Sequence, residues 1–285
     1  MIIRPIYGAA VLLAVSFVAG SLSPSAPPQP RERFAGGYQV LSGDFHVHSF
    51  PLSWGVLSPF DTVLEARRQG LDIVAMSGHN TVIVAKAGRW FSRLIGGPTV
   101  MVSEEVHSPR YHMIAVGIER TVSWNQPAAA AVDDVHRQGG VAIVAHPVEQ
   151  YWPGWDSAAM ARVDAAEVVH PVVFDDPKNR RELRQFFARR KLTAIGSSDF
   201  HESPSMGLCR TWVFVTENSE RGVLEALRRG HTVVYDFDGA VFGDPDLIRL
   251  NVVPKPTLPQ KTFWDRVSML TGLWGLLVAA AVLRH

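Results

Sequence analysis

The stretch YQVLSGDFHVH, residues 38–48, is the starting point for interpreting this chain. Alternate side chains of a β-strand share a face. If these residues form a strand, His46 and His48 point the same way, and Asp44 lies on that face too. Such a face is either exposed to solvent at the edge of a sheet, or its polar side chains bind a ligand. The stretch alone leaves both interpretations open.

Short apolar runs alternate with helical patterns through the middle of the chain. The runs are nearly continuous in Val, Ile, Ala and Leu, as in strands that are covered on both faces. They lie at residues 71–77, 98–104, 111–118, 140–146, 164–170 and 192–198. The helical patterns lie at residues 58–70, 125–140, 176–191 and 218–230. This alternation predicts an α/β fold with a mainly parallel sheet, closed as a barrel.

The first helical pattern carries its own start and stop signals. Ser58 is the expected N-cap, Pro59 takes the first helical position, and Gly70 follows the end. The other helical patterns repeat much of this signature.

Composition excludes several classes of protein. The chain has 285 residues and a formal net charge of +1, which argues against a broad basic surface for nucleic acid. Its single cysteine, Cys209, excludes an internal disulfide and a multi-cysteine metal site. Eleven histidines are many for this length, and their positions are ordered.

An uncharged apolar segment lies near each end of the chain, at residues 6–22 and 267–283. Both reach the minimum length for a membrane span, about 17 residues. The first could instead be a cleaved signal peptide, and the second an amphipathic terminal helix. The expected organisation is a signal anchor or signal peptide (1–22), a proline-rich tether (23–37), a central folded domain (38–250), a second tether (251–262) and a C-terminal transmembrane helix (263–285).

The flanking charges indicate an orientation for such an anchored protein. Arg4 and Arg284 would lie on the cytoplasmic side, which leaves the middle of the chain outside the cytoplasm, close to the bilayer. Lys261 and Arg266 lie on the other flank of the second segment and weaken this assignment.

Side chains that can bind metals gather where the predicted strands end. Functional groups of α/β folds collect at the carboxyl ends of strands. His112 is the exception, because it lies early in its run. The others, in chain order, are His46, His48, His79, Glu104, Glu105, His146, Asp199 and His201.

A single histidine at a strand end is more often a hydrogen-bonded structural residue than a ligand. Several imidazoles and carboxylates that meet at one rim would repel and crowd one another unless cations bind them. Neutral imidazole nitrogens and carboxylate oxygens are natural ligands of Zn, Mn or Fe. The set as a whole therefore predicts a metal site.

An ordered series of motifs strengthens this prediction. The motifs are GDFHVHS, GLDIVAMSGHNT, VSEEV, YHMIAVGI, GGVAIVAHP and IGSSDFH. In this order they resemble the motifs of the polymerase and histidinol phosphatase (PHP) superfamily, over about residues 40–215. The GDFHVHS and GHNT variants are most similar to its carbaryl-hydrolase-like (CehA/McbA) branch. The resemblance implies a distorted seven-stranded (β/α) barrel, two or three divalent metal ions and hydrolysis, usually of phosphate esters.

Position by position, the resemblance implies two metals that share one carboxylate. Glu105 would bridge them, and it is chosen over Glu104 because it aligns with the family's glutamate. The other ligands would be His46, His48 and Asp199 for the first metal, and His112 and His146 for the second.

A third metal position is less well supported. His79 and His201 match its ligands, but the loop that normally adds one more reads SFPLSWGV, with Ser53 and Trp54 at the expected place. Gly78 also replaces the family's aspartate. A binuclear centre with a vacant or weak third position is the first expectation.

Two metals in this arrangement can polarise a phosphoryl or carbonyl oxygen and activate water. The expected enzyme is a phosphoesterase acting on a small ester. The alternatives are a carbamate or carboxyl-ester hydrolase, favoured by a missing third cation, and a non-catalytic metal-binding module. Arg110 and Arg210 are candidate contacts for an anionic substrate. His170 is a candidate proton shuttle, whereas His107, His136 and His231 are interpreted as solvated or loop residues.

Overall fold

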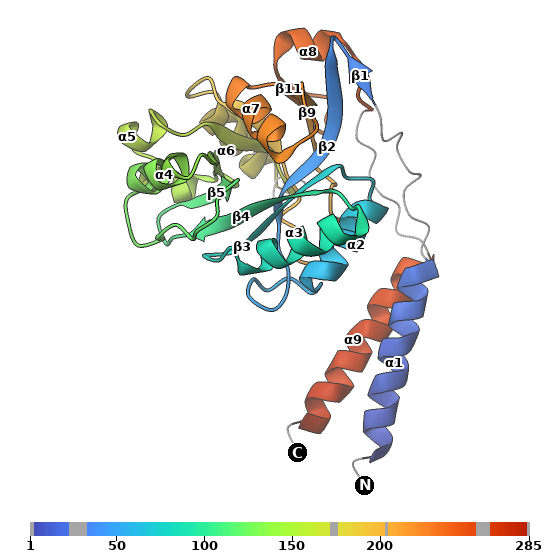
Figure 1. The fold of residues 1–285 in the computed structure, drawn as a ribbon. Coiled ribbons are helices and arrows are strands. Elements are labelled where there is room, and N and C mark those ends of the chain that lie inside the picture. Colours follow the sequence, from blue (N-terminus) through green and yellow to red (C-terminus); the bar gives the residue numbers. More distant parts are fainter. Residues whose placement is uncertain (1–2, 23–32, 172–175, 203–204, 255–262, 284–285) are drawn as a thin grey trace. The chain divides into compact units, whose positions relative to one another are not determined.

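The computed structural model describes residues 3–22, 33–171, 176–202, 205–254 and 263–283. They divide into two units (Figure 1). One consists of the terminal helices α1 (Ile3–Leu22) and α9 (Phe263–Leu283), and the other contains the remaining elements. The two predicted proline-rich tethers lie largely outside the described residues. The described end of the first one contributes β1 (Phe34–Ala35), which pairs with β2 (Tyr38–Val47).

The terminal unit is a pair of helices that pack against each other. Ser16 and Ser268 each donate from the side-chain hydroxyl to the other's backbone carbonyl, at 2.8 and 2.9 Å. The apolar helix expected at each end is therefore present. Among the described residues, however, no helix combines the length and the apolar character that crossing a membrane requires. The spans expected from the sequence find no support in this part of the chain.

The larger unit is built on a mixed sheet of 11 strands (Figure 1). Its main path runs β11-β10-β9-β2-β3-β4-β5-β6-β7-β8. A bridge between Val47 and Phe200 links the end of β2 to the loop after β8, so the sheet is nearly closed. Beyond β1 and β2, the strands are β3 (Ile73–His79), β4 (Thr99–His107), β5 (His112–Val116), β6 (Val141–Val144), β7 (Ala165–Val169), β8 (Thr193–Gly196), β9 (Thr211–Val215), β10 (Thr232–Tyr235) and β11 (Val241–Gly243).

The expectation of a mainly parallel sheet is wrong, because six of the ten strand pairings of the described residues are antiparallel, including those of β9, β10 and β11. The course of β5 matters most for the site. Strand β5 runs antiparallel to both β4 and β6, whereas β2, β3 and β4 pair in parallel, as do β6, β7 and β8. Only residues 108–111 separate β4 from β5, which is too short for the helical crossover that parallel neighbours need. The beginning of β5 therefore lies at the same edge as the ends of its neighbours.

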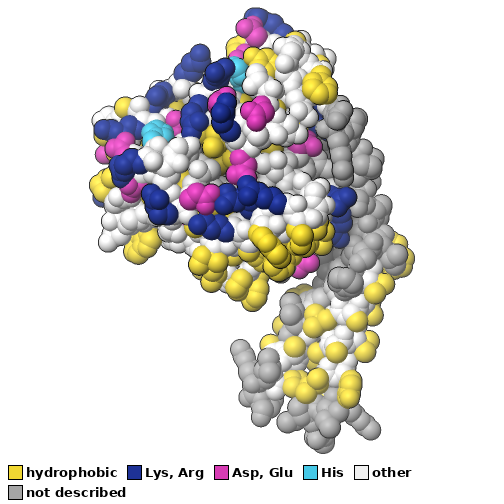
Figure 2. Space-filling model, in the orientation of Figure 1, with side chains coloured by type: hydrophobic (Ala, Val, Ile, Leu, Met, Phe, Trp, Pro, Cys, Tyr) yellow, Lys and Arg dark blue, Asp and Glu magenta, His cyan; other side chains and the backbone are white. Residues whose placement is uncertain are grey.

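Helices pack around the sheet. They are α2 (Pro59–Arg68), α3 (Ile83–Ile95), α4 (Ala128–Arg137), α5 (Ser157–Met160), α6 (Pro177–Phe187), α7 (Glu220–Arg229) and α8 (Pro245–Arg249), with a 3₁₀ helix at Glu149–Gly154. Figure 1 shows α2 and α3 side by side next to β3 and β4. Figure 2 shows charges of both signs interspersed on one face, with hydrophobic side chains along the edge near α2 and α3. The exposed apolar residues of those helices include Phe60, Ile83, Trp90 and Leu94.

The inner face of the sheet carries both a core and the candidate site. Ile73 and Ala75 of β3 and Met101 of β4 belong to the inner apolar cluster, which α7 also packs against. Because side chains alternate along a strand, the inner series of β3 continues to His79, and that of β4 continues to Glu105 and His107. The inward-facing apolar residues of these strands thus fill one end of the barrel. The inward-facing residues farther along the same strands are polar, and they lie at the other end.

The first predicted helix start is confirmed. Ser58 is the N-cap of α2, its hydroxyl accepts a hydrogen bond from the Asp61 backbone N–H at 3.2 Å, and Pro59 is the first helical residue. This bond satisfies one of the amide groups that the first turn leaves without an intrahelical partner.

Removing this cap should destabilise the protein modestly. We expect Ser58→Ala to lower the free energy of unfolding by about 1 kcal/mol, because the cap's hydrogen bond is lost. Denaturant unfolding of the full chain measures the change. Ser123→Ala, at an exposed loop serine that caps no helix, is the control and should change stability by less than about 0.5 kcal/mol. Equal losses for the two variants would contradict the capping role.

Candidate metal centre

Six strand or loop segments bring the predicted ligands together inside one mouth of the barrel. His46 and His48 come from the end of β2, His79 and Glu105 from β3 and β4, and His112 from the start of β5. His146, Asp199 and His201 come from the loops after β6 and β8. His146 and Asp199 have positive φ angles of 23° and 50°, so their side chains leave the strand ends at unusual angles.

Glu105 lies at the centre of the cluster, between two sets of imidazoles. Its Oε2 atom is 3.4 Å from His46 Nε2, 3.5 Å from His48 Nε2 and 3.1 Å from His79 Nε2. Its Oε1 atom is 2.9 Å from His112 Nδ1 and 3.4 Å from His146 Nε2. One carboxylate thus faces different ligand sets with its two oxygens.

Asp199 completes the first of these sets. Its Oδ1 atom is 3.2 Å from His46 Nε2 and 3.0 Å from His48 Nε2. Among the described residues, these three atoms have no hydrogen-bond partner although they are buried. Burying polar atoms without partners is costly, and imidazole nitrogens with carboxylate oxygens suit Zn, Mn or Fe. The residues therefore fit a divalent cation bound between them.

Glu167 on β7 is a buried partner that the sequence analysis missed. Its Oε1 atom is 3.0 Å from His46 Nδ1, and its Oε2 atom accepts a hydrogen bond from the His146 backbone N–H at 2.6 Å. A carboxylate on the far nitrogen of a ligand histidine fixes the tautomer and the ring orientation. The available signal was a lone acidic residue within an apolar strand.

Two further residues support the cluster from outside. The Ser53 hydroxyl lies 2.6 Å from His48 Nδ1 and accepts a hydrogen bond from the His79 backbone N–H at 3.0 Å. Asp44 accepts hydrogen bonds from the Ser198 and Gly207 backbone N–H groups, and so holds the loop that carries Asp199.

Asp44 therefore does not join His46 and His48 as the strand alternation suggested. The pairing of β2 with β3 shifts its register between Asp44 and Val47. This irregularity allows Phe45 to face the inner core while His46 faces the site.

The electrostatics of the cluster are dominated by its carboxylates. Burial opposes a charged imidazole at His46, but Asp199, Glu167 and Glu105 outweigh it and raise the pKa of His46 well above its usual value. Burial alone would raise the pKa of Glu105 and of Asp199, yet the charge of His46 helps to hold both well below their usual values. The carboxylates stay ionised, and the site requires compensating positive charge.

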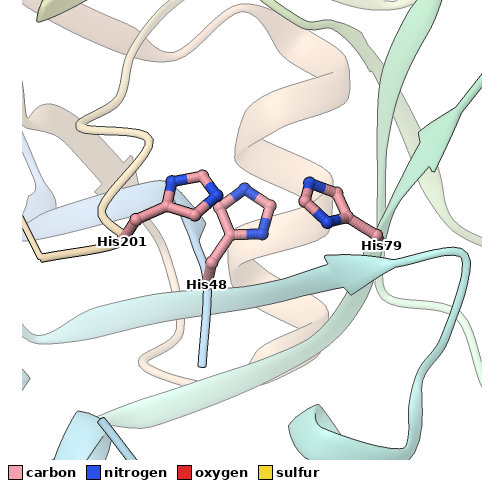
Figure 3. Close-up of side chains that lie close together, drawn as sticks. All are labelled: His48, His79 and His201. Atoms are coloured by element: carbon pink, nitrogen blue, oxygen red, sulfur yellow. The ribbon is translucent and has the colours of Figure 1, made fainter. Parts of the chain in front are cut away.

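Three histidines of the cluster lie close together (Figure 3). His48, His79 and His201 converge from three segments, and their potential ligand atoms lie within 4.8 Å of one another. The His201 ring stacks on that of His48, with centroids 4.1 Å apart, and the His79 ring lies 4.5 Å from His48. His79 and His201 are partly exposed, whereas His48 is fully buried.

Of the other three candidate residues, His170 lies at the cluster, whereas Arg110 and Arg210 do not contact it. His170 lies beside the cluster, with Nε2 3.7 Å from Asp199 Oδ2, and burial lowers the pKa of its imidazole to about 4. Arg110 is exposed. Arg210 donates to the backbone carbonyls of Gly207 and Gln69, so its guanidinium ties two loops together. Neither arginine gains support as a substrate contact.

Comparisons with known proteins establish the fold class. A family model described as PHP-associated matches residues 177–232, which include α6, β8, β9 and α7. No curated protein matches the chain significantly. Among solved structures, a two-domain protein from Bacteroides vulgatus ATCC 8482, containing a predicted PHP-like metal-dependent phosphoesterase, is similar with a TM-score of 0.61 and 22% identity. The match covers 79% of this chain and 73% of that one.

Two more distant structures are also similar. An amidohydrolase from Chromobacterium violaceum, with bound sulfate and no metal, has a TM-score of 0.47 and 16% identity, over 58% of this chain and 89% of that one. PsfC from Pseudomonas syringae PB-5123 has a TM-score of 0.48 and 13% identity, over 84% and 99% of the two chains. The first likeness shows that this chain has a PHP-like α/β fold. None of the three structures distinguishes the carbaryl-hydrolase-like branch.

Proposed function

We propose that this chain is a metal-dependent phosphoesterase that acts at a centre of at least two divalent cations. The observation that carries the proposal is the position of Glu105. Its two oxygens lie within 3.5 Å of five imidazole nitrogens in two separate sets. A carboxylate shared in this way is suited to hold two cations side by side.

Each of the surrounding side chains has a distinct task in this proposal. His46, His48 and Asp199 would hold one cation with Glu105, and His112 and His146 would hold the other. Glu167 accepts the Nδ1 proton of His46, which leaves the Nε2 lone pair directed into the cluster. When bound, a pair of such cations supplies Lewis acidity and lowers the pKa of water enough for a nucleophile to form near neutral pH.

The substrate would approach from the partly exposed side of the cluster. Asp199, His79 and His201 are accessible there, whereas His46, His48 and Glu167 are fully buried. His170 lies next to Asp199 and is placed to exchange a proton with a leaving group on that side. The fold neighbour from Bacteroides vulgatus contains a predicted phosphoesterase, and the proposal extends that class of activity to this chain.

A second candidate function is the hydrolysis of aryl carbamates or carboxyl esters. The observation that favours it is Trp54, whose side chain is exposed at the mouth with its ring centroid 5.0 Å from that of His79. An exposed indole beside the cluster can stack on an aromatic leaving group. This activity would also agree with the resemblance to the carbaryl-hydrolase-like branch.

Assays of the purified full chain test both candidates. We expect Zn²⁺- or Mn²⁺-loaded protein to hydrolyse aryl phosphate esters, to lose this activity in a strong chelator and to regain it when metal is restored. Parallel assays use a phosphomonoester, a phosphodiester, a carboxyl ester and a carbamate. Turnover of the last two alone would favour the second candidate. Bound metal without turnover of any of the four would contradict an enzymatic role and favour a metal-binding module.

A further inference from the structure

We propose that His107 completes a third cation site with His79 and Glu105. The inference rests on the metal-binding part of the proposed function. From the sequence alone, His107 was expected to be a solvated or loop residue, and His201 was expected to share the third site with His79. The ion expected at a site with two imidazoles and one carboxylate is a divalent transition metal such as Zn²⁺.

The three side chains present their ligand atoms to one small volume. His79 Nε2 lies 3.1 Å from Glu105 Oε2, and His107 Nδ1 lies 4.0 Å from the same oxygen. Potential ligand atoms of all three residues lie within 4.8 Å of one another. The rings of His79 and His107 are 4.9 Å apart and nearly perpendicular, at 72°, so they do not stack and both edges can face a shared ion.

The His107 ring is oriented in an unexpected way for a solvated side chain. As a whole its side chain is 40% exposed, yet its Nδ1 atom is buried. Within the described part of the chain, that nitrogen has no hydrogen-bond partner. A freely solvated histidine would turn its nitrogens toward water, whereas this ring directs one of them into the cluster.

The backbone explains why His107 is held in this position. His107 follows Glu105 by two residues in β4, so both side chains lie on the inner face of the sheet. The Asn80 side chain fixes the backbone of His107 from the turn that follows β3. Asn80 Oδ1 accepts a hydrogen bond from the His107 N–H at 2.9 Å, and Asn80 Nδ2 donates to the His107 carbonyl at 3.2 Å. His79 pairs in register with Glu105 across β3 and β4.

His201 is the competing partner for His79. The His79 and His201 rings are 5.9 Å apart, which is farther than the 4.9 Å between His79 and His107. His201 Nδ1 also lies 3.0 Å from the Asp199 backbone carbonyl, which leaves Nε2 as its potential ligand atom. The shorter ring distance and the buried Nδ1 of His107 favour His107, and both alternatives can be tested.

Metal stoichiometry of the full chain provides the test. Each protein is loaded with Zn²⁺, freed of excess metal by gel filtration and measured by elemental analysis. We expect three equivalents per chain in the unmodified protein and two in His107→Ala. His79→Ala and the double variant should each hold two, because both residues belong to the same site. His136→Ala is the matched control and should hold three. His136 lies on α4, its side chain is similarly exposed, at 37%, and it pairs with Asp164 and not with a residue of the cluster.

Several outcomes would overturn the inference. Two equivalents in the unmodified protein would exclude a third site. Three equivalents in His107→Ala together with two in His201→Ala would assign the third ion to His201 instead. A metal-edge anomalous map of crystals of the unmodified protein gives a measurement that does not depend on the folding of a variant. It should show a peak between His79, Glu105 and His107, and a map without that peak would count against the site. Three bound ions without hydrolysis would contradict the proposed function and leave this inference standing.

Discussion

Replacing Glu105 by glutamine should reduce hydrolysis by about a thousand-fold. The amide keeps the shape of the side chain but removes its charge, and one of the two ligand sets would then face an NH₂ group instead of an oxygen. Because Glu105 faces both sets, the variant should also bind fewer cations than the unmodified chain. Steady-state kinetics and elemental analysis of the purified full chain measure the two effects.

Glu104 offers a matched control for this substitution. It precedes Glu105 on β4, is equally buried, and points to the opposite side, where its Oε1 accepts the Val122 backbone N–H. Glu104→Gln should retain metal content and turnover within a few-fold. If Glu104→Gln lost activity and metal as Glu105→Gln is expected to, the assignment of the shared carboxylate would be wrong.

Replacing Glu167 by glutamine should weaken metal binding by about 10- to 100-fold. Glu167 does not face the proposed cations directly, but it fixes the tautomer of His46 and accepts the His146 backbone N–H. An amide can satisfy only one of these two donors, so the orientation of the ligand rings should loosen. Competition with a chromophoric chelator measures the affinity of each variant.

The control for Glu167 is a buried carboxylate that contacts none of the proposed metal ligands among the described residues. Glu182 on α6 accepts the Glu149 backbone N–H at 2.8 Å, and its side chain is 9% exposed. Glu182→Gln should leave the metal affinity unchanged, even if it lowers stability. An unchanged affinity in Glu167→Gln would show that His46 is oriented by its packing alone.

Local signals in the sequence predicted much of the scaffold. The apolar runs at residues 71–77 and 98–104 became β3 and β4, and Ser58 and Pro59 start α2 as expected. Helix α3 was not predicted, and its N-cap residue, Val82, makes no side-chain capping hydrogen bond. The strands β9, β10 and β11 were also missed. Apolar runs of three to five residues are too short for periodicity to separate a strand from a buried helical segment.

The sequence by itself determined which residues could bind metal, because imidazoles and carboxylates at strand ends carry a chemical signature that needs no coordinates. Strand direction was decided only by the tertiary structure, since it depends on pairing between segments far apart in the chain. His112 shows the difference: it looked misplaced at the start of its strand, but the antiparallel course of β5 brings that start to the shared mouth. The roles of Glu167 and His107 also depend on tertiary packing. Only the packing shows that Glu167 contacts His46 Nδ1 and that His107 directs its own Nδ1 into the cluster.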